Sequence, residues 1–194
     1  MRVLVLYAHP VETSFCAALH KRTVAALKAG GHIVDDCDLN AERFDPVLGR
    51  QERLDYHDTA INRRQVEPYV ARLLDAEALV LVYPVWNFGF PAILKGVLDR
   101  VFLPGVSFHL KDGDYTPGLR HIRRLTAVCT YGGHRWRAWT MGDPPRKCVT
   151  RMLRVLVAPT ASSAYLTLYD MNNFVPERGA ACLDRVERHF AGWT

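Results

Sequence analysis

The chain has 194 residues, of which 49% are hydrophobic and 23% are charged. This length suits one α/β domain spanning residues 1–194, and the composition excludes a disordered or fibrous protein. Lys and Arg exceed Asp and Glu by five (25 against 20) but form only short clusters, at residues 120–124 and 146–154, so nucleic acid binding is disfavoured.

The five cysteines are widely spaced, and none belongs to a CxxC pair. This pattern predicts neither a disulfide framework nor a zinc site, and it favours a reducing, cytoplasmic location. The apolar run Val3–Ala8 is shorter than a signal-peptide core, and no segment approaches the length of a membrane span. We therefore expect no integral membrane association. No HExxH motif, His-Cys cluster or carboxylate pair indicates a metal.

Continuous aliphatic and β-branched runs predict buried parallel strands, and periodic segments between them predict helices. In chain order, the expected elements are a strand at 3–8, a helix at 14–29, a strand at 32–39, a loop at 40–65, a helix at 66–76, a strand at 78–83, a helix at 92–102, a loop at 103–123, a strand at 125–130, a helix at 146–157, a strand at 164–169 and a helix at 176–190. This alternation predicts an α/β fold, a doubly wound five-stranded parallel sheet with helices on both faces.

Ligands of an open doubly wound sheet bind beyond the carboxyl ends of its strands, where the winding direction reverses. That rule selects the loops at residues 9–15, 84–91 and 131–134. The first loop lacks GxGxxG and GK[ST], which weakens a Rossmann dehydrogenase or kinase interpretation. It places Thr13 and Ser14 at a helix start, where hydroxyls and free amides can hold a phosphate. A simple N-cap role for Ser14 is an equally good interpretation.

The second loop carries Trp86, Phe88 and Phe90 between two prolines, with Gly89 expected to make the turn. Core packing is the default role of aromatic side chains. Three of them at a ligand-binding edge, however, offer a stacking surface for a flat heterocycle. Asn87 is a candidate either to bond the edge of such a ring or to stabilise the turn.

Two other features of these loops carry weaker signals. His9 follows the first strand, where a structural hydrogen bond is a more common role than that of a catalytic base. Gly132-Gly133 permits close backbone approach to a ligand, although an ordinary turn is the more common interpretation of such a pair.

The segment from Tyr83 to Phe102, YPVWNFGFPAILKGVLDRVF, resembles a segment of the NAD(P)H dehydrogenase (quinone) or diaphorase-type proteins, the quinone-reductase branch of the flavodoxin-like superfamily. AHPVETSF after the first strand and TYGG after the fourth are also similar to motifs of that family, in the same order. The resemblance spans most of the chain. It is strong up to Phe102 and loose after Gly133.

The resemblance implies a single flavodoxin-like flavin-binding domain in which NAD(P)H reduces a flavin, FMN or FAD, and the flavin reduces a quinone or a similar acceptor. It also implies a homodimer with sites near the interface. Carried over by position, the residues bordering the flavin would be His9, Ser14, Phe15 and Cys16 at the phosphate and ribityl chain, Pro84, Val85, Trp86, Asn87 and Phe88 along the isoalloxazine, and Thr130, Tyr131, Gly132 and Gly133 at its other edge.

The chain departs from the resembled family after the Gly-Gly pair. Well-known members carry a Tyr and a His there, proposed to stabilise charge and to move a proton. If Gly142-Asp143 aligns with the family's Gly-Asp, Met141 stands at the position of that His. His134 and Arg135 are the candidate catalytic residues, with a solvated loop as the alternative. We therefore predict that flavin reduction needs no titrating His and that its rate is nearly flat around pH 6.5.

A second function stays open at the level of the sequence, namely a flavin-bearing regulatory or binding subunit of a membrane transporter. An electron-carrier flavodoxin is disfavoured because those proteins are typically acidic and lack the PAILKG segment. The sequence decides neither between FMN and FAD nor between NADH and NADPH.

Overall fold

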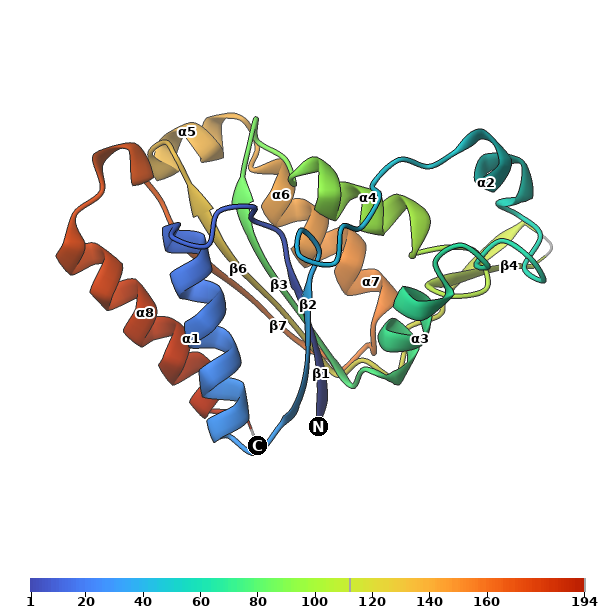
Figure 1. The fold of residues 1–194 in the computed structure, drawn as a ribbon, viewed down its shortest axis with the longest axis horizontal. Helices are drawn as coiled ribbons and strands as arrows, with labels where there is room; N and C mark the ends of the chain where they lie inside the picture. The colour runs from blue at the N-terminus through green and yellow to red at the C-terminus, as the bar shows by residue number, and fades with distance from the viewer. Residues whose placement is uncertain (112, 194) are drawn as a thin grey trace.

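The computed structural model describes residues 1–111 and 113–193; residues 112 and 194, which fall within the expected loop at 103–123 and the expected domain, lie outside the described residues. Its main sheet has five parallel strands in the order β2-β1-β3-β6-β7 (Figure 1). The strands are β1 Arg2–Tyr7, β2 Ile33–Asp38, β3 Ala78–Val85, β6 Arg124–Tyr131 and β7 Ser162–Leu168. The predicted five-stranded parallel sheet is confirmed.

Helices cover both faces of the sheet (Figure 1). One face carries α1 (Phe15–Ala29) and α8 (Pro176–Ala191). The other carries α3 (Glu67–Asp75), α4 (Ala92–Arg100) and a helical run made of α6 (Pro144–Lys147), the π-helix η1 (Cys148–Leu153) and α7 (Arg154–Leu156).

Successive side chains of a strand point to opposite faces of the sheet, so the sheet has one hydrophobic core on each face. In β1, Val3, Val5 and Tyr7 point into the core under α1 and α8, whereas Leu4 and Leu6 point into the core under α3 and α4. Strands buried on both faces account for the uninterrupted apolar runs in the sequence.

Several segments differ from the sequence prediction. The expected loop at 40–65 contains a short helix, α2 (Arg50–Asp55), and the expected loop at 103–123 contains an antiparallel hairpin of β4 (Phe108–Lys111) and β5 (Asp114–Pro117). A helix α5 (Arg135–Thr140) and a 3-10 turn η2 (Met171–Asn173) were not expected. These elements are short and mostly exposed, so no continuous apolar period marks them in the sequence.

A buried ion pair fixes the 40–65 segment to α4. The carboxylate of Glu52 accepts hydrogen bonds from Arg100 Nε at 2.9 Å and, through Oε2, from the Gly49 amide at 2.9 Å. Arg100 Nη2 lies 2.8 Å from the same carboxylate, and the two side chains are only 7% and 9% exposed.

Candidate functional site at the carboxyl edge of the sheet

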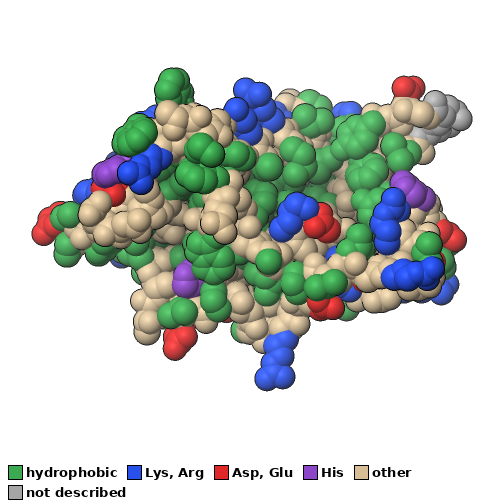
Figure 2. Space-filling model, turned by 90° about the horizontal axis from the view of Figure 1, so that it is seen from above, with side chains coloured by type: hydrophobic (Ala, Val, Ile, Leu, Met, Phe, Trp, Pro, Cys, Tyr) green, Lys and Arg blue, Asp and Glu red, His purple; other side chains and the backbone are tan. Residues whose placement is uncertain are grey.

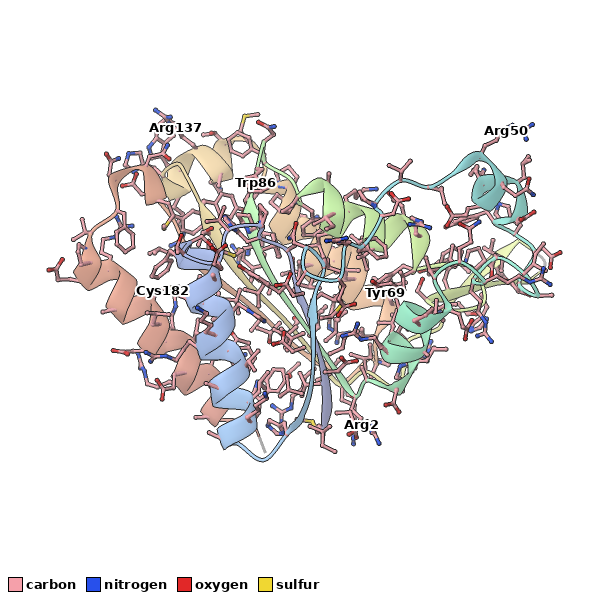
Figure 3. All side chains as sticks on the ribbon, viewed as in Figure 1. Arg2, Arg50, Tyr69, Trp86, Arg137 and Cys182 are labelled. Carbon is pink, nitrogen blue, oxygen red and sulfur yellow. The ribbon has the colours of Figure 1, made fainter. Side chains whose placement is uncertain are left out.

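The three predicted loops meet at one edge of the molecule because β1, β3 and β6 are neighbours in the sheet. The register pairs Val85 with Tyr131, so β3 and β6 end level, and it pairs Tyr7 with Val82, so β1 ends three residues earlier. Figure 2 looks onto this edge and shows hydrophobic side chains gathered across its middle. Trp86 and Arg137 both lie at this end of the molecule (Figure 3).

The first loop ends in the N-terminus of α1. Ser14 caps this helix, and its Oγ accepts a hydrogen bond from the Ala17 amide at 3.1 Å. The amides of Phe15 and Cys16 have no acceptor among the described residues, and at a helix start such amides attract anions. The Cys16 side chain is buried in the core, and the half-buried Phe15 ring lies 5.2 Å from that of Phe174. Their backbone amides, rather than their side chains, are therefore the groups available to a ligand.

A buried hydroxyl without a partner lies close to this helix start. Tyr7 is 4% exposed, and its hydroxyl makes no hydrogen bond among the described residues. Burial, together with the nearby Cys16 thiol, raises the pKa of Tyr7 to about 12, and the Ser14 side chain opposes this shift, which agrees with a hydroxyl near the beginning of α1. Buried hydroxyls normally have a partner, so this one together with the two free amides fits a bound phosphate.

His9 has a structural role in the first loop. Its Nδ1 accepts a hydrogen bond from the Val11 amide at 3.0 Å, and burial lowers the pKa of the imidazole, which agrees with a neutral ring. The ring also meets Trp86 edge-on, with 5.8 Å between the ring centroids. His9 thus joins the first loop to the second.

The second loop is a two-residue hairpin turn. Trp86 and Gly89 exchange backbone hydrogen bonds of 3.2 and 2.9 Å, and the residues between them, Asn87 and Phe88, have φ of 48° and 55°. The expectation that Gly89 makes the turn is wrong, because positive φ falls on Asn87 and Phe88, as a type I′ turn requires. A left-handed Phe is strained by about 1–3 kcal/mol, and such strain clusters at ligand sites.

The turn presents two aromatic side chains at the edge. Trp86 is 47% exposed and Phe88 is 38% exposed, whereas the ring of Phe90 packs against Tyr83 at 5.0 Å. Pro84 and Val85 are buried within β3. Trp86 and Phe88 are therefore the flat surfaces that a planar ligand can reach, and Pro84 and Val85 can contribute only backbone groups.

The third loop continues β6 and is held by the chain that follows β7. The carbonyl of Gly132 accepts from the Asn172 amide at 3.0 Å, and that of Gly133 accepts from the Asp170 amide at 2.8 Å. The amides of the two glycines donate no hydrogen bond among the described residues, so they are available to a ligand. Thr130 is buried. The site role predicted for it is therefore confined to its backbone.

A tyrosine network behind the third loop was not predicted from the sequence. The hydroxyl of Tyr131 donates to Asp143 and lies 3.1 Å from that of Tyr165, which is 3.4 Å from the hydroxyl of Tyr83. Burial raises the pKa of Tyr131, Tyr165 and Tyr83 well above the usual value. Asp143 adopts a left-handed φ of 45°. The one sequence signal for Asp143 was its place in the run Gly-Asp-Pro-Pro.

The two candidate catalytic residues begin α5. His134 is its N-cap, and His134 Nδ1 lies 3.2 Å from a carboxylate oxygen of Asp170, which also pairs with Arg178. Arg135 is exposed at the first helical position. Met141, where the resembled family has a His, is 58% exposed at the end of this helix and carries no proton to transfer. The catalytic role of His134 and Arg135 stays a prediction.

The described residues contain no group of three or more His, Cys, Asp or Glu side chains arranged to hold a metal ion. No helix among them is both long and apolar enough to cross a membrane.

The sheet order, the helix N-terminus and the three-loop edge define a doubly wound protein of the flavodoxin-like class. Residues 1–181 match the family described as having the flavodoxin-like fold, and the chain belongs to that family. The predicted resemblance is thereby confirmed.

Curated relatives in this family are oxidoreductases by name. An uncharacterized NAD(P)H oxidoreductase of Haemophilus influenzae is 33% identical over 135 residues, which is 69% of this chain and 66% of the relative. An FMN-dependent NADH:quinone oxidoreductase of Beijerinckia indica is 31% identical over 50% of each chain. The matched part of this chain thus spans two thirds or less of these two relatives.

Solved structures share the fold over nearly the full length. The NAD(P)H:quinone oxidoreductase of Methanothermobacter marburgensis superposes with a TM-score of 0.84, covering 99% of this chain and 98% of that one at 22% identity. An FMN-dependent NADH-azoreductase of Bacillus anthracis, solved with FMN, has a TM-score of 0.78 over 98% and 97% of the chains at 17% identity. At these identities the likeness shows the fold.

Proposed function

We propose that this protein is an FMN-dependent NAD(P)H oxidoreductase that reduces a quinone or a similar acceptor. One observation carries the proposal: a helix start with two free amides, an exposed aromatic turn and a glycine loop meet at one edge of the sheet. FMN has a phosphate for the helix start, a flat ring for the aromatic turn and polar ring edges for the glycine loop. The relatives' names support an oxidoreductase rather than a transporter subunit.

Each group of residues has a defined task in this proposal. The amides of Phe15 and Cys16 and the Tyr7 hydroxyl hold the phosphate. Trp86 and Phe88 lie against the ring and exclude water from it. The amides of Gly132 and Gly133 donate to the ring edge, where they stabilise negative charge. When bound, FMN supplies the chemistry by accepting a hydride from NAD(P)H and giving it to the acceptor.

Flavin binding is the direct test. We expect the purified protein to bind one FMN per chain, measured by absorbance titration, and to bind riboflavin more weakly because riboflavin lacks the phosphate. Steady-state quinone reduction should follow ping-pong kinetics, since donor and acceptor use one flavin face in turn. Failure to bind either FMN or FAD stoichiometrically would overturn the proposed function.

Removal of the exposed indole should weaken the ring site. Trp86→Ala is expected to reduce FMN affinity by about 0.5–1.5 kcal/mol beyond the loss of buried area, because the stacking contact is lost. Tyr115→Ala is the matched control, since Tyr115 on β5 is 47% exposed, like Trp86, but lies outside the site. Equal FMN affinities for the Trp86 variant and the unmodified protein would assign Trp86 to packing.

The rate of flavin reduction should be nearly flat around pH 6.5, the region where an ordinary His titrates. The expectation rests on Met141, whose thioether cannot exchange a proton at the position where the resembled family has a His. Stopped-flow reduction by NAD(P)H across that region, in the unmodified protein and in His134→Ala, checks this expectation. A one-proton dependence that disappears in His134→Ala would show that His134 is catalytic.

The family resemblance also leads us to propose a homodimer in the cytoplasm. Trp136 and Met141 on and after α5 are 59% and 58% exposed, which supports an interface beside the site. The five free cysteines support a reducing compartment. Sedimentation velocity of the FMN-loaded protein should give the mass of a dimer, and a monomer at every concentration would contradict the proposal.

A further inference from the structure

A cavity lies beside the candidate flavin site. It has a volume of about 280 Å³ and opens between α5 and the helical run that begins with α6. The side chains that matter for its chemistry are Arg135, Trp139, Arg146, Lys147, Arg151 and Tyr169. The volume is near the lower end for ligand pockets, so the cavity holds part of a dinucleotide rather than all of it.

The charge of this cavity is strongly positive. Arg135, Arg146, Lys147 and Arg151 contribute four cations, and none of them forms an ion pair with a carboxylate among the described residues. The wall also contains one carboxylate, that of Asp143, which accepts a hydrogen bond from Tyr131, so four cations face one anion. A cluster with this excess of positive charge attracts a multiply charged anion.

The geometry brings these cations to one place. Lys147 Nζ lies over Gly142, 3.2 Å from where a Cβ on that glycine would be. Burial raises the pKa of the Tyr169 hydroxyl. The positive charges of Arg146 and Arg135 act in the opposite direction and lower it, so both side chains lie near this hydroxyl. Arg151 belongs to the π-helix η1, a rare conformation that occurs frequently at functional sites.

The cavity shares a wall with the third loop of the candidate flavin site. Arg135 stands two residues after Gly133, and the Tyr169 ring lies 4.8 Å from that of Tyr131 at the end of β6. Any ligand in the cavity is therefore adjacent to the edge at which the hydride donor must arrive. Trp139, 79% exposed, adds a flat face suited to a purine base.

We propose that this cavity binds the adenosine 2′-phosphate of NADPH and makes NADPH the preferred hydride donor. The inference rests on the proposed function, because the two nicotinamide donors differ only in this phosphate. Arg and Lys side chains are the usual protein ligands of phosphate, with Arg offering paired donors. The pyrophosphate, present in both donors, has the same chemistry, and the experiment must separate the two sources.

Donor kinetics of the FMN-loaded protein separate them. We expect the unmodified protein to have a higher kcat/KM with NADPH than with NADH. In Arg146→Gln/Arg151→Gln, kcat/KM for NADPH should fall by about tenfold or more, as is usual for the loss of charged hydrogen bonds, while that for NADH changes by less than about twofold. Equal falls with both donors would assign the cavity to the pyrophosphate, and an unchanged kcat/KM with both donors would exclude contact; either result overturns the proposal.

Arg50→Gln is the matched control, because Arg50 is an exposed arginine on α2, at the other end of the molecule from Arg137 (Figure 3). This variant should change kcat/KM for neither donor. Thermal melting of both variants, unchanged within error, verifies that the double variant is folded.

A binding measurement keeps this inference separate from the proposed function. By calorimetry on the flavin-free protein, adenosine 2′,5′-bisphosphate should bind at least about tenfold more tightly than 5′-AMP, and the double variant should abolish the difference. Equal affinities in the unmodified protein would overturn the 2′-phosphate assignment. If FMN does not bind while the bisphosphate preference is intact, the proposed oxidoreductase function fails and the phosphate site stands.

Discussion

Replacing Ser14 by Asp is expected to lower FMN affinity by about a hundredfold or more without loss of stability. Asp is as good an N-cap as Ser, and the helix dipole favours a carboxylate there, so α1 should keep its start. The same carboxylate faces the proposed phosphate. Two unit charges about 5 Å apart at an effective dielectric constant of about 20 repel each other by roughly 3 kcal/mol, which is about a hundredfold in affinity.

Riboflavin and Ser14→Ala are the controls for this variant. Riboflavin lacks the phosphate, so its affinity should be the same for Ser14→Asp and the unmodified protein. Ser14→Ala should lose about 1 kcal/mol of stability with the cap but keep most of its FMN affinity, because the amides of Phe15 and Cys16 are still present. If Ser14→Asp binds FMN normally, the phosphate is not at this helix, and Ser14 is a cap alone.

The sheet could be predicted from the sequence because its strands are buried on both faces. In β1, β3 and β6 every residue between the ends is apolar or a small polar residue, so the runs are visible without knowing what they pack against. The rule that ligands bind at the carboxyl edge then selected the loops without any contact information. Local hydrophobicity and one topological rule were sufficient for this part.

The turn after β3 shows where local reasoning failed. Gly89 is the residue best suited to positive φ, yet that conformation falls on Asn87 and Phe88. The reason is that Trp86 and Gly89 pair as the ends of a hairpin, which fixes the conformation of the two residues between them. Intrinsic preference is outweighed here by pairing across the turn.

The tyrosine network and the basic cavity depend on contacts between distant segments. Tyr131 meets Asp143 and Tyr165 only because β6 and β7 are adjacent and α6 folds back over them. Likewise, Arg135 and Arg151 are sixteen positions apart in the sequence (151 − 135), and the left-handed Asp143 lies between them. A run of basic residues in the sequence indicates a charged surface, but not that its members surround one cavity.

Removal of the buried carboxylate on α2 is the second change with a large expected effect. Glu52→Ala should lower the free energy of unfolding by about 3–5 kcal/mol, because it removes the buried counter-charge of Arg100 and leaves only the exposed Asp45 carboxylate, 3.8 Å away. It also removes the acceptor of the Gly49 amide. For a chain of this length the melting temperature should fall by roughly 6–20 °C, measured by calorimetry or circular dichroism.

Two further variants make that result specific to the buried pair. Asp99→Ala breaks the exposed Lys95–Asp99 pair on the same helix, where the side chains are 57% and 42% exposed, and should cost no more than about 0.5 kcal/mol. Glu52→Leu/Arg100→Met removes both charges and should recover much of the stability lost in Glu52→Ala, because replacing a whole buried pair by apolar groups is often neutral. A Glu52→Ala variant as stable as Asp99→Ala would mean that water reaches Arg100, and that the 40–65 segment is held to α4 by apolar contacts such as that of Pro46 with Gly96.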